Sequence, residues 1–211
     1  MAYDLEEQEQ LAQLKSWWRD HGGQVLMAVI VVAASVSAWR GWEWYQGNQA
    51  AKAGALYEQL VKGVAANDAK AVSVAAGSLF DSHAGTMHAS LAALTAAKFN
   101  FDRNDLKAAK LQLQWALDKA KTEELRDLAR LRLAGLLMDE KAYDEALKLL
   151  EAKHADAFAA QYALLKGDLL VAKNQAGDAR AAYRVALEKA DKKQGGAFKE
   201  SVQMRLDALG G

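Results

Sequence analysis

The run from Gly22 to Trp39 restricts the possible fold more than any other feature, because its 18 residues include no charged side chain. At 1.5 Å per residue, a helix of this length reaches roughly 27 Å, close to the thickness of the hydrocarbon core of a bilayer. The run therefore predicts a helix that crosses a membrane. The alternative is a helix buried in the core of a soluble protein.

Tryptophans mark both ends of this run. Five of the six tryptophans in the chain are found there: Trp17, Trp18, Trp39, Trp42 and Trp44. An indole ring combines an apolar face with a hydrogen-bond donor, so it settles at the interface between membrane and water. We expect these five side chains to be membrane-interface anchors, which a buried core helix would not need.

A cleaved secretory signal is a second alternative, since Val36-Ser37-Ala38 resembles a cleavage site at the end of an apolar segment. Residues 1–21 argue against it: a signal begins with a short basic segment, whereas these residues include five acidic and two basic side chains. Cleavage after Ala38 would also leave the tryptophans that follow without a purpose. We therefore predict an uncleaved anchor.

Charge does not decide the orientation of that anchor. Lys15 and Arg19 precede the run, and Arg40 and Lys52 follow it, so the positive-inside rule gives a near tie. A long downstream domain crosses the membrane largely regardless of its charge. The simpler topology therefore has the short N-terminal tail inside and the large C-terminal domain outside.

Composition restricts the remaining residues to an all-α domain. The chain of 211 residues has no proline and no cysteine, so it lacks the commonest helix breaker and cannot form disulfides. Its formal net charge is zero, without the dense basic field of a nucleic-acid-binding protein. We predict a tail over residues 1–21, a transmembrane anchor over 22–45 and a helical-repeat domain over 46–211.

Helices are expected along the whole chain. Residues 4–18 form either a short helix or a solvated tail, and the membrane helix continues through 40–66. The other predicted helices cover 69–80, 85–101, 106–120, 124–139, 142–152, 156–173, 177–190 and 197–209. Helices of this length joined by short turns must be antiparallel neighbours.

An internal period of about 34 residues indicates tetratricopeptide-like repeats over roughly 84–190. In two units, a small residue is followed by a large, a small and a large one at fixed spacing: Ala134, Leu137, Ala146 and Leu150, then Gly167, Leu170, Ala179 and Tyr183. A third unit matches less fully through Ala109, Leu113 and Ala116.

Two further features belong to this repeat pattern. Lys153 stands where the next small residue is expected, so the helix before it should be short. A terminal capping helix is predicted from the apolar stripe of Phe198, Val202, Leu206 and Leu209. The alternative to repeats is an irregular helical bundle with alanine-rich interfaces.

The first helices of such repeats line a concave surface. The side chains predicted on it form a candidate partner-binding strip: Leu128, Leu131, Gly135, Met138, Gln161, Leu164, Asp168 and Val171. An apolar strip that contains methionine suits a hydrophobic segment or a partner helix. In the alternative, the N-terminal helices fold over the strip and bury it as ordinary core.

The sequence contains no recognisable catalytic or metal-binding motif. The four histidines are His21, His83, His88 and His154, and no pair has the spacing that puts two zinc ligands on one helix face. Phosphate-binding loops and a nucleophile elbow are also missing. We expect no cofactor, no metal and no enzyme activity; an unrecognised catalytic site would require a polar cleft.

Besides the acidic tail, five runs of residues are distinctive: Trp39-Arg-Gly-Trp42, Ala89-Ser-Leu-Ala-Ala-Leu94, Asn104-Asp-Leu-Lys-Ala-Ala-Lys-Leu-Gln-Leu-Gln114, Leu131-Arg-Leu-Ala134 and Gly177-Asp-Ala-Arg-Ala-Ala-Tyr183. These features resemble the YfgM-type ancillary subunits of the bacterial SecYEG translocon. Together with the single apolar run, they are spread along the chain, so the resemblance covers essentially its full length.

The resemblance implies a type II protein of the bacterial inner membrane. Its tail (1–21) would lie in the cytoplasm and its tetratricopeptide-like domain (46–211) in the periplasm. Such proteins associate with the translocon and with the periplasmic chaperone PpiD, and help transfer translocated proteins to periplasmic chaperones. Unfolded or translocating polypeptides are therefore possible ligands. The alternative is a membrane-anchored scaffold for cell-envelope assembly that binds a folded partner.

Overall fold

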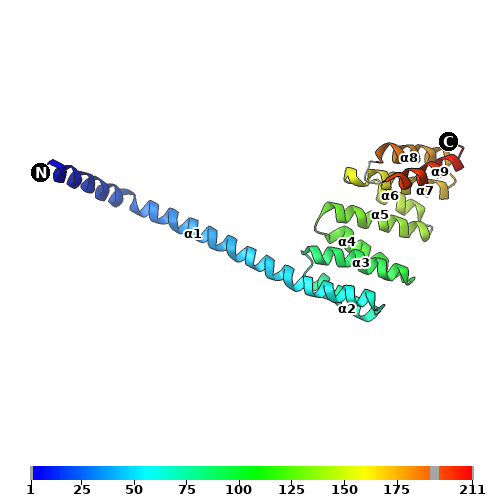
Figure 1. The fold of residues 1–211 in the computed structure, drawn as a ribbon, viewed down its shortest axis with the longest axis horizontal. Coiled ribbons are helices and arrows are strands. Elements are labelled where there is room, and N and C mark those ends of the chain that lie inside the picture. The colour runs from blue at the N-terminus through cyan, green and yellow to red at the C-terminus, as the bar shows by residue number, and fades with distance from the viewer. Residues whose placement is uncertain (1, 191–194, 211) are drawn as a thin grey trace. The chain divides into compact units, whose positions relative to one another are not determined.

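The computed structural model describes residues 2–190 and 195–210, which form helices joined by short turns and contain no strand (Figure 1). The chain divides into two compact units, Met1–Gln49 and Ala50–Gly211. For the described residues, the predicted all-α class is confirmed.

Helix α1 (Ala2–Ala65) supplies the described residues of the first unit. The tail helix, the apolar run and the segment 40–66 all belong to this one helix. Gly22 and Gly23 do not interrupt it; no proline is present, and Gln24, Leu26 and Met27 directly after them favour helix. Apolar side chains such as Leu26 and Val32 are exposed, so this part of α1 packs on nothing within its unit.

The second unit begins with the last residues of α1 and continues as a series of hairpins. Its further elements are α2 (Ala69–Ser82), α3 (Met87–Asp102), α4 (Leu106–Lys119), α5 (Glu123–Asp139), α6 (Tyr143–Leu150), the 3-10 turn η1 (Asp156–Phe158), α7 (Ala159–Ala172), α8 (Ala176–Lys189) and α9 (Gly195–Ala208). From α2 to α9, each helix packs mainly on its neighbours in the sequence (Figure 1). Helix α6 has eight residues and is short, as predicted.

Side-chain caps begin several of these helices at the joints expected from the sequence. Asp68, Thr86, Asp105 and Thr122 each accept a hydrogen bond from a backbone N–H in the first turn of the following helix. These bonds satisfy donors that a helix N-terminus otherwise leaves unpaired. The local sequence therefore fixes where α2, α3, α4 and α5 begin.

Four residues in the left-handed region mark the turn inside each hairpin. Asn67, Asn104, Lys141 and Asn174 have φ between 53° and 62°. In all four turns, the N–H of the next residue donates to the carbonyl oxygen five residues before it, at 2.8–2.9 Å, which is the Schellman arrangement. The shared bond identifies four equivalent hairpins in the described chain, so the repeats begin one hairpin earlier than residue 84.

The first of these hairpins, formed by the end of α1 and by α2, inverts the size pattern of the others. Leu60 is buried where Ala97, Ala134 and Gly167 stand in the later hairpins. Ala76 is buried where the others have Leu113, Leu150 and Tyr183. The helices approach most closely at Gly63 instead, where a Cβ would lie 3.1 Å from the Cβ of Ala71.

The fourth hairpin has a close contact between a glycine of one helix and an aromatic ring of the other. A Cβ on Gly167 of α7 would lie 2.3 Å from Cε1 of Tyr183 on α8, which is closer than any van der Waals contact allows. The Tyr183 hydroxyl donates to Oδ1 of Asp168 at 2.8 Å. Burial, followed by the Asp168 carboxylate, raises the pKa of Tyr183 well above its usual value. Only glycine fits opposite this ring.

Asp127 of α5 fastens the loop between α6 and α7. Its side chain is 4% exposed, and it accepts hydrogen bonds from the Ala155 N–H at 2.8 Å and from Nη1 of Arg130 at 2.5 Å. The hydroxyl of Tyr162 donates to the Asp127 carbonyl oxygen at 3.0 Å, and the ring of His154 lies 4.2 Å from that of Tyr162. The buried carboxylate is therefore fully used in holding the fold.

Helix α9 closes the described end of the stack. Val202 and Leu206 are buried in a cluster with residues of α7 and α8, as the apolar stripe predicts for a capping helix. Nε of Arg205 donates to Oδ1 of Asp168 at 3.0 Å, which ties α9 to α7.

Candidate functional site

The exposed apolar part of α1 is the first candidate site. Among the described helices, α1 is the one long and apolar enough to cross a membrane, with a window of mean hydropathy 1.8 of which 6% is buried. A core helix of a soluble protein passes the same length test but is mostly buried, which this one is not. The five predicted interface tryptophans are all exposed on α1, at both ends of the apolar run.

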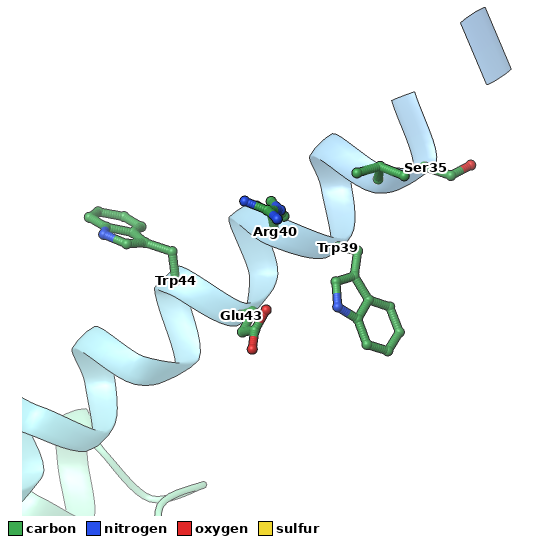
Figure 2. Close-up of a pocket in the computed structure, with 6 residues that line it drawn as sticks. Ser35, Trp39, Arg40, Glu43 and Trp44 are labelled. Atoms are coloured by element: carbon green, nitrogen blue, oxygen red, sulfur yellow. The ribbon is translucent and has the colours of Figure 1, made fainter. Parts of the chain in front are cut away.

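The residues after the run mix aromatic and charged side chains. Trp39 and Trp44 point to different sides of the helix, with Arg40 and Glu43 between them (Figure 2). At residue 40 the uncharged run therefore ends, and charged side chains begin to alternate with indole rings. That alternation is typical of a helix leaving the apolar part of a bilayer.

The second candidate site is the predicted strip, whose α5 half faces α3. Leu128, Leu131, Gly135 and Met138 are half-buried on α5. Leu128, Leu131 and Met138 all pack on the central core cluster, and Leu128, Gly135 and Met138 also line cavities described below. The spacing of these residues thus puts them on one face of the helix, but only part of that face borders a cavity.

The α7 half of the strip has different surroundings. Leu164 packs on the C-terminal core cluster, and Asp168 is engaged by Tyr183 and Arg205. Gln161 is half-buried, and Val171 is exposed. None of these four residues lines the cavities that the α5 residues line. The structure therefore does not join the two halves into one continuous open strip.

Two neighbouring cavities lie between α3 and α5, and we call them together the α3–α5 groove. The smaller, of about 390 Å³, is bounded by Ala97 and Phe101 of α3, Leu113 of α4, and Gly135 and Met138 of α5. The larger, of about 640 Å³, is lined by the polar residues Asn67, Thr95 and Arg103 and by six apolar ones: Val64, Leu91, Leu94, Phe99, Leu125 and Leu128. Lys98, Asp102 and Arg132 line both.

The N-terminal helices extend the stack and leave the α5 strip residues half-buried. Ala53 and Leu60 of α1 are buried in one cluster with Val72 and Leu79 of α2 and with residues of α3. Val64, at the end of α1, forms one wall of the larger cavity. The alternative in which these helices bury the strip as core is therefore not what the structure shows for the α5 half.

Polar groups in the described domain are mainly structural. No three His, Asp or Glu side chains in the described residues gather as a metal site would require. The buried carboxylate of Asp127 and the half-buried one of Asp168 bond to neighbouring helices and loops. The groove itself combines apolar walls with the charged side chains of Lys98, Asp102, Arg103, Arg132 and Asp139.

The sequence model of one family, described as "Tetratricopeptide repeat-like domain", matches residues 15–211. A protein of Haemophilus influenzae named "Ancillary SecYEG translocon subunit" is 31% identical over 99% of this chain and 100% of its own length. Proteins with the same name are 30% identical in Escherichia coli, over 96% of each chain, and 32% identical in Neisseria gonorrhoeae, over 99% of this chain. The chain belongs to the family of ancillary SecYEG translocon subunits.

Membership of the ancillary subunit family confirms the predicted resemblance and the tetratricopeptide-like fold. The family match begins at residue 15, so it includes the apolar run as well as the hairpins. The two candidate sites therefore both lie within the part of the chain that the family shares.

The sequence prediction omitted the α3 side of the groove in this family member. Leu91, Leu94 and Phe101 stand 37 residues before Leu128, Leu131 and Met138, so they occupy the same places in the preceding repeat. The signal was available, because Ala97 stands 37 residues before Ala134. Extending the third, less complete unit upstream by one helix would have found them.

Proposed function

We propose that this chain is a non-catalytic adaptor of the bacterial inner membrane that associates with the SecYEG translocon. The observation that carries the proposal is the full-length similarity to proteins named ancillary SecYEG translocon subunits. A similarity confined to the hairpins would support only a helical-repeat fold, since such repeats serve many functions. Here it includes the apolar run as well.

In the proposed topology, residues 22–45 span the membrane, 1–21 lie in the cytoplasm and 46–211 lie in the periplasm. The exposed apolar face of α1 and its flanking tryptophans support the span. Because the chain has no cysteine, the orientation can be measured with single-cysteine variants at Gln10 and at the exposed Ala181. A maleimide that cannot cross the inner membrane should label Ala181→Cys in spheroplasts and leave Gln10→Cys unlabelled until the cells are lysed.

The repeat domain is proposed to recruit translocated proteins and pass them to periplasmic chaperones, among them PpiD. The α3–α5 groove supports this role, because its apolar walls suit a segment of unfolded polypeptide. The candidate strip is proposed to contact partners at two separate places: its α5 half, which includes Leu131, borders the groove, and the exposed Val171 belongs to a second contact on α7.

The test is in-cell cross-linking of two full-length proteins. One is the natural chain, and in the other an unrelated membrane helix of the same length replaces residues 22–45. We expect the natural chain to capture both the translocon and a periplasmic chaperone. The exchanged chain should keep the chaperone and lose the translocon if the span is the docking element.

Two outcomes would contradict the proposal. Capture of no Sec component by the natural chain would overturn the association with the translocon. Capture of cell-wall or outer-membrane assembly factors instead would favour the alternative, a membrane-anchored scaffold that binds a folded partner.

A further inference from the structure

Arg132 lies at the junction of the two cavities of the α3–α5 groove and lines both of them. Along α5, Leu125 and Leu128 precede it on the side of the larger cavity. Gly135 and Met138 follow it on the side of the smaller one. The Arg132 side chain thus borders both cavities, each of which has apolar residues in its wall.

The other cations that line the groove already have partners. Nζ of Lys98 is 2.7 Å from a carboxylate oxygen of Asp102. Nη1 of Arg103 donates to Oδ1 of Asn67 at 2.7 Å, and its guanidinium lies over the ring of Phe99. Neither group requires a ligand to complete its interactions.

Arg132 differs from both, because it forms no ion pair with any described carboxylate. Its one hydrogen bond in the described chain runs from Nη1 to the carbonyl oxygen of Leu94 at 3.3 Å. The Arg132 side chain is exposed at one end and buried at the other, and the buried part lowers its pKa. A guanidinium group has five N–H donors in a planar fork that matches a carboxylate, so most of its capacity is unused.

We propose that the α3–α5 groove binds a polypeptide segment in which an internal Asp or Glu, flanked by apolar residues, pairs with Arg132. This inference rests on the proposed function, since it specifies the class of segment that the repeat domain takes. Apolar side chains on either side of the carboxylate enter the two cavities. Charge and shape are then both complementary.

The position of Arg132 favours an internal carboxylate over the carboxylate of a chain terminus. Cavities are present on both sides of the guanidinium, and a terminal carboxylate would leave one of them without a side chain to fill it. Asp102 lines both cavities but is paired with Lys98, and Asp139 in the lining of the smaller cavity would repel a second acidic residue there. The preferred segment therefore has one central acid with apolar residues around it.

The test measures binding of fluorescent peptides to the purified full-length chain in detergent. One peptide has leucines around a central Glu, its ends being acetylated and amidated. A second replaces that Glu by Gln, and a third presents the same leucines before a free C-terminal carboxylate. We expect the Glu peptide to bind about tenfold more tightly than the Gln peptide, and more tightly than the third.

Variants assign the effect to Arg132. In Arg132→Gln, the preference for Glu over Gln should disappear, while binding of the Gln peptide stays within about twofold. The matched control is Arg184→Gln on the exposed surface of α8, which should keep the full preference. Arg132→Glu should reverse the preference toward a peptide with a central Lys, and the reversal cannot arise from simple unfolding.

Three results would overturn the inference: no binding of the Glu peptide, equal binding of the Glu and Gln peptides, or a preference that survives in Arg132→Gln. A preference for the free C-terminal carboxylate would instead assign Arg132 to a chain terminus, against the proposal. None of these results depends on the translocon. The adaptor function could fail in cross-linking while the peptide preference holds, or the reverse.

Discussion

The apolar part of α1 and the hairpins of the second unit are both helical and contain the same kinds of apolar residue, but they differ in how far these side chains are buried. Val31 on α1 is 57% exposed, whereas Val72 on α2 is 1% exposed. Neither region contains proline, and both are rich in alanine. Helix formation therefore does not distinguish them, and the difference is in what surrounds each helix.

The difference in burial indicates what surrounds the apolar side chains of each region. In the hairpins, small side chains such as Ala109 and Ala146 let neighbouring helices approach, so apolar area is removed from water between helices. In the apolar run, no described segment of the first unit covers the side chains, and a bilayer would supply the apolar surroundings. The hairpins therefore depend on specific contacts between helices, whereas the apolar run depends on the average polarity of its side chains.

The largest effect is expected where the hairpins depend on a single buried group. Asp127→Ala removes the acceptor for the Ala155 N–H and for Arg130, leaving a buried donor and a cation without their partner. We expect a loss of about 3–5 kcal/mol in the free energy of unfolding. Chemical denaturation of the full chain in detergent, followed by circular dichroism, measures it. The control Asp118→Ala, on the exposed surface of α4, should cost less than about 0.5 kcal/mol.

Membrane insertion of the apolar run should depend on the polarity of its side chains and on little else. Val31→Arg places a charge at its centre and should disfavour membrane insertion by about 2.5–3.5 kcal/mol. The matched control is Val61→Arg, on the same helix but within the second unit, where the valine is also exposed. Extraction of membranes at alkaline pH measures the inserted fraction. An equal loss of insertion in both variants would show that the two parts of α1 do not differ in surroundings.

Gly167→Ala tests shape at a site where polarity does not change. The added methyl group would collide with the ring of Tyr183, and we expect a loss of about 2–3 kcal/mol in unfolding free energy. The double variant Gly167→Ala with Tyr183→Leu recreates the pair Ala134 and Leu150 of the preceding hairpin, so it should recover most of that loss.

Gly135→Ala is the control for this experiment. No atom lies within 4 Å of a Cβ built at Gly135, so the substitution should stabilise α5 by about 0.5–1 kcal/mol. The double variant would not recover the lost stability if the hydrogen bond of Tyr183 to Asp168 stabilised the fourth hairpin more than the packing of its ring does. Comparing Tyr183→Leu alone with Tyr183→Phe separates the two contributions.

The smallest effect is expected from a surface charge pair between hairpins. Nζ of Lys110 lies 3.0 Å from a carboxylate oxygen of Glu140, and both side chains are about one-third exposed. A double-mutant cycle with alanine at both positions should give a coupling of roughly 0.2–1 kcal/mol, decreasing with salt. A coupling energy larger than the loss of unfolding free energy in Asp127→Ala would mean that surface charge, rather than buried contact, holds the hairpins together.

Signals within short segments of the sequence explain which features of the fold and of the candidate site could be predicted. The caps Asp68, Asp105 and Thr122 and the spacing of apolar residues put the helix boundaries close to where the structure has them. Lys153 correctly indicated a short α6, because a long charged side chain could not replace a small buried one. The α5 half of the strip was placed by periodicity, since every residue it needs is on one helix.

The remaining features depend on pairs of residues far apart in the chain. The first hairpin escaped prediction because Leu60 with Ala76 fills the same kind of space as Ala134 with Leu150, but with the sizes exchanged. Likewise, Asp168 reads as an open concave residue until Arg205 of α9 is placed beside it. Neither relationship is visible within one helix.

The sequence by itself determined the helical fold, the tetratricopeptide-like register of the later hairpins and the exposed apolar run, because each is encoded in neighbouring residues or in a short period. Only the tertiary structure decided which faces stay open. It brought Leu94 and Phe101 of α3 to the groove beside α5, left Arg132 without an ion pair to any described carboxylate, and tied Asp168 of α7 to α9. Burial and charge pairing are properties of two surfaces in contact, so no single segment contains them.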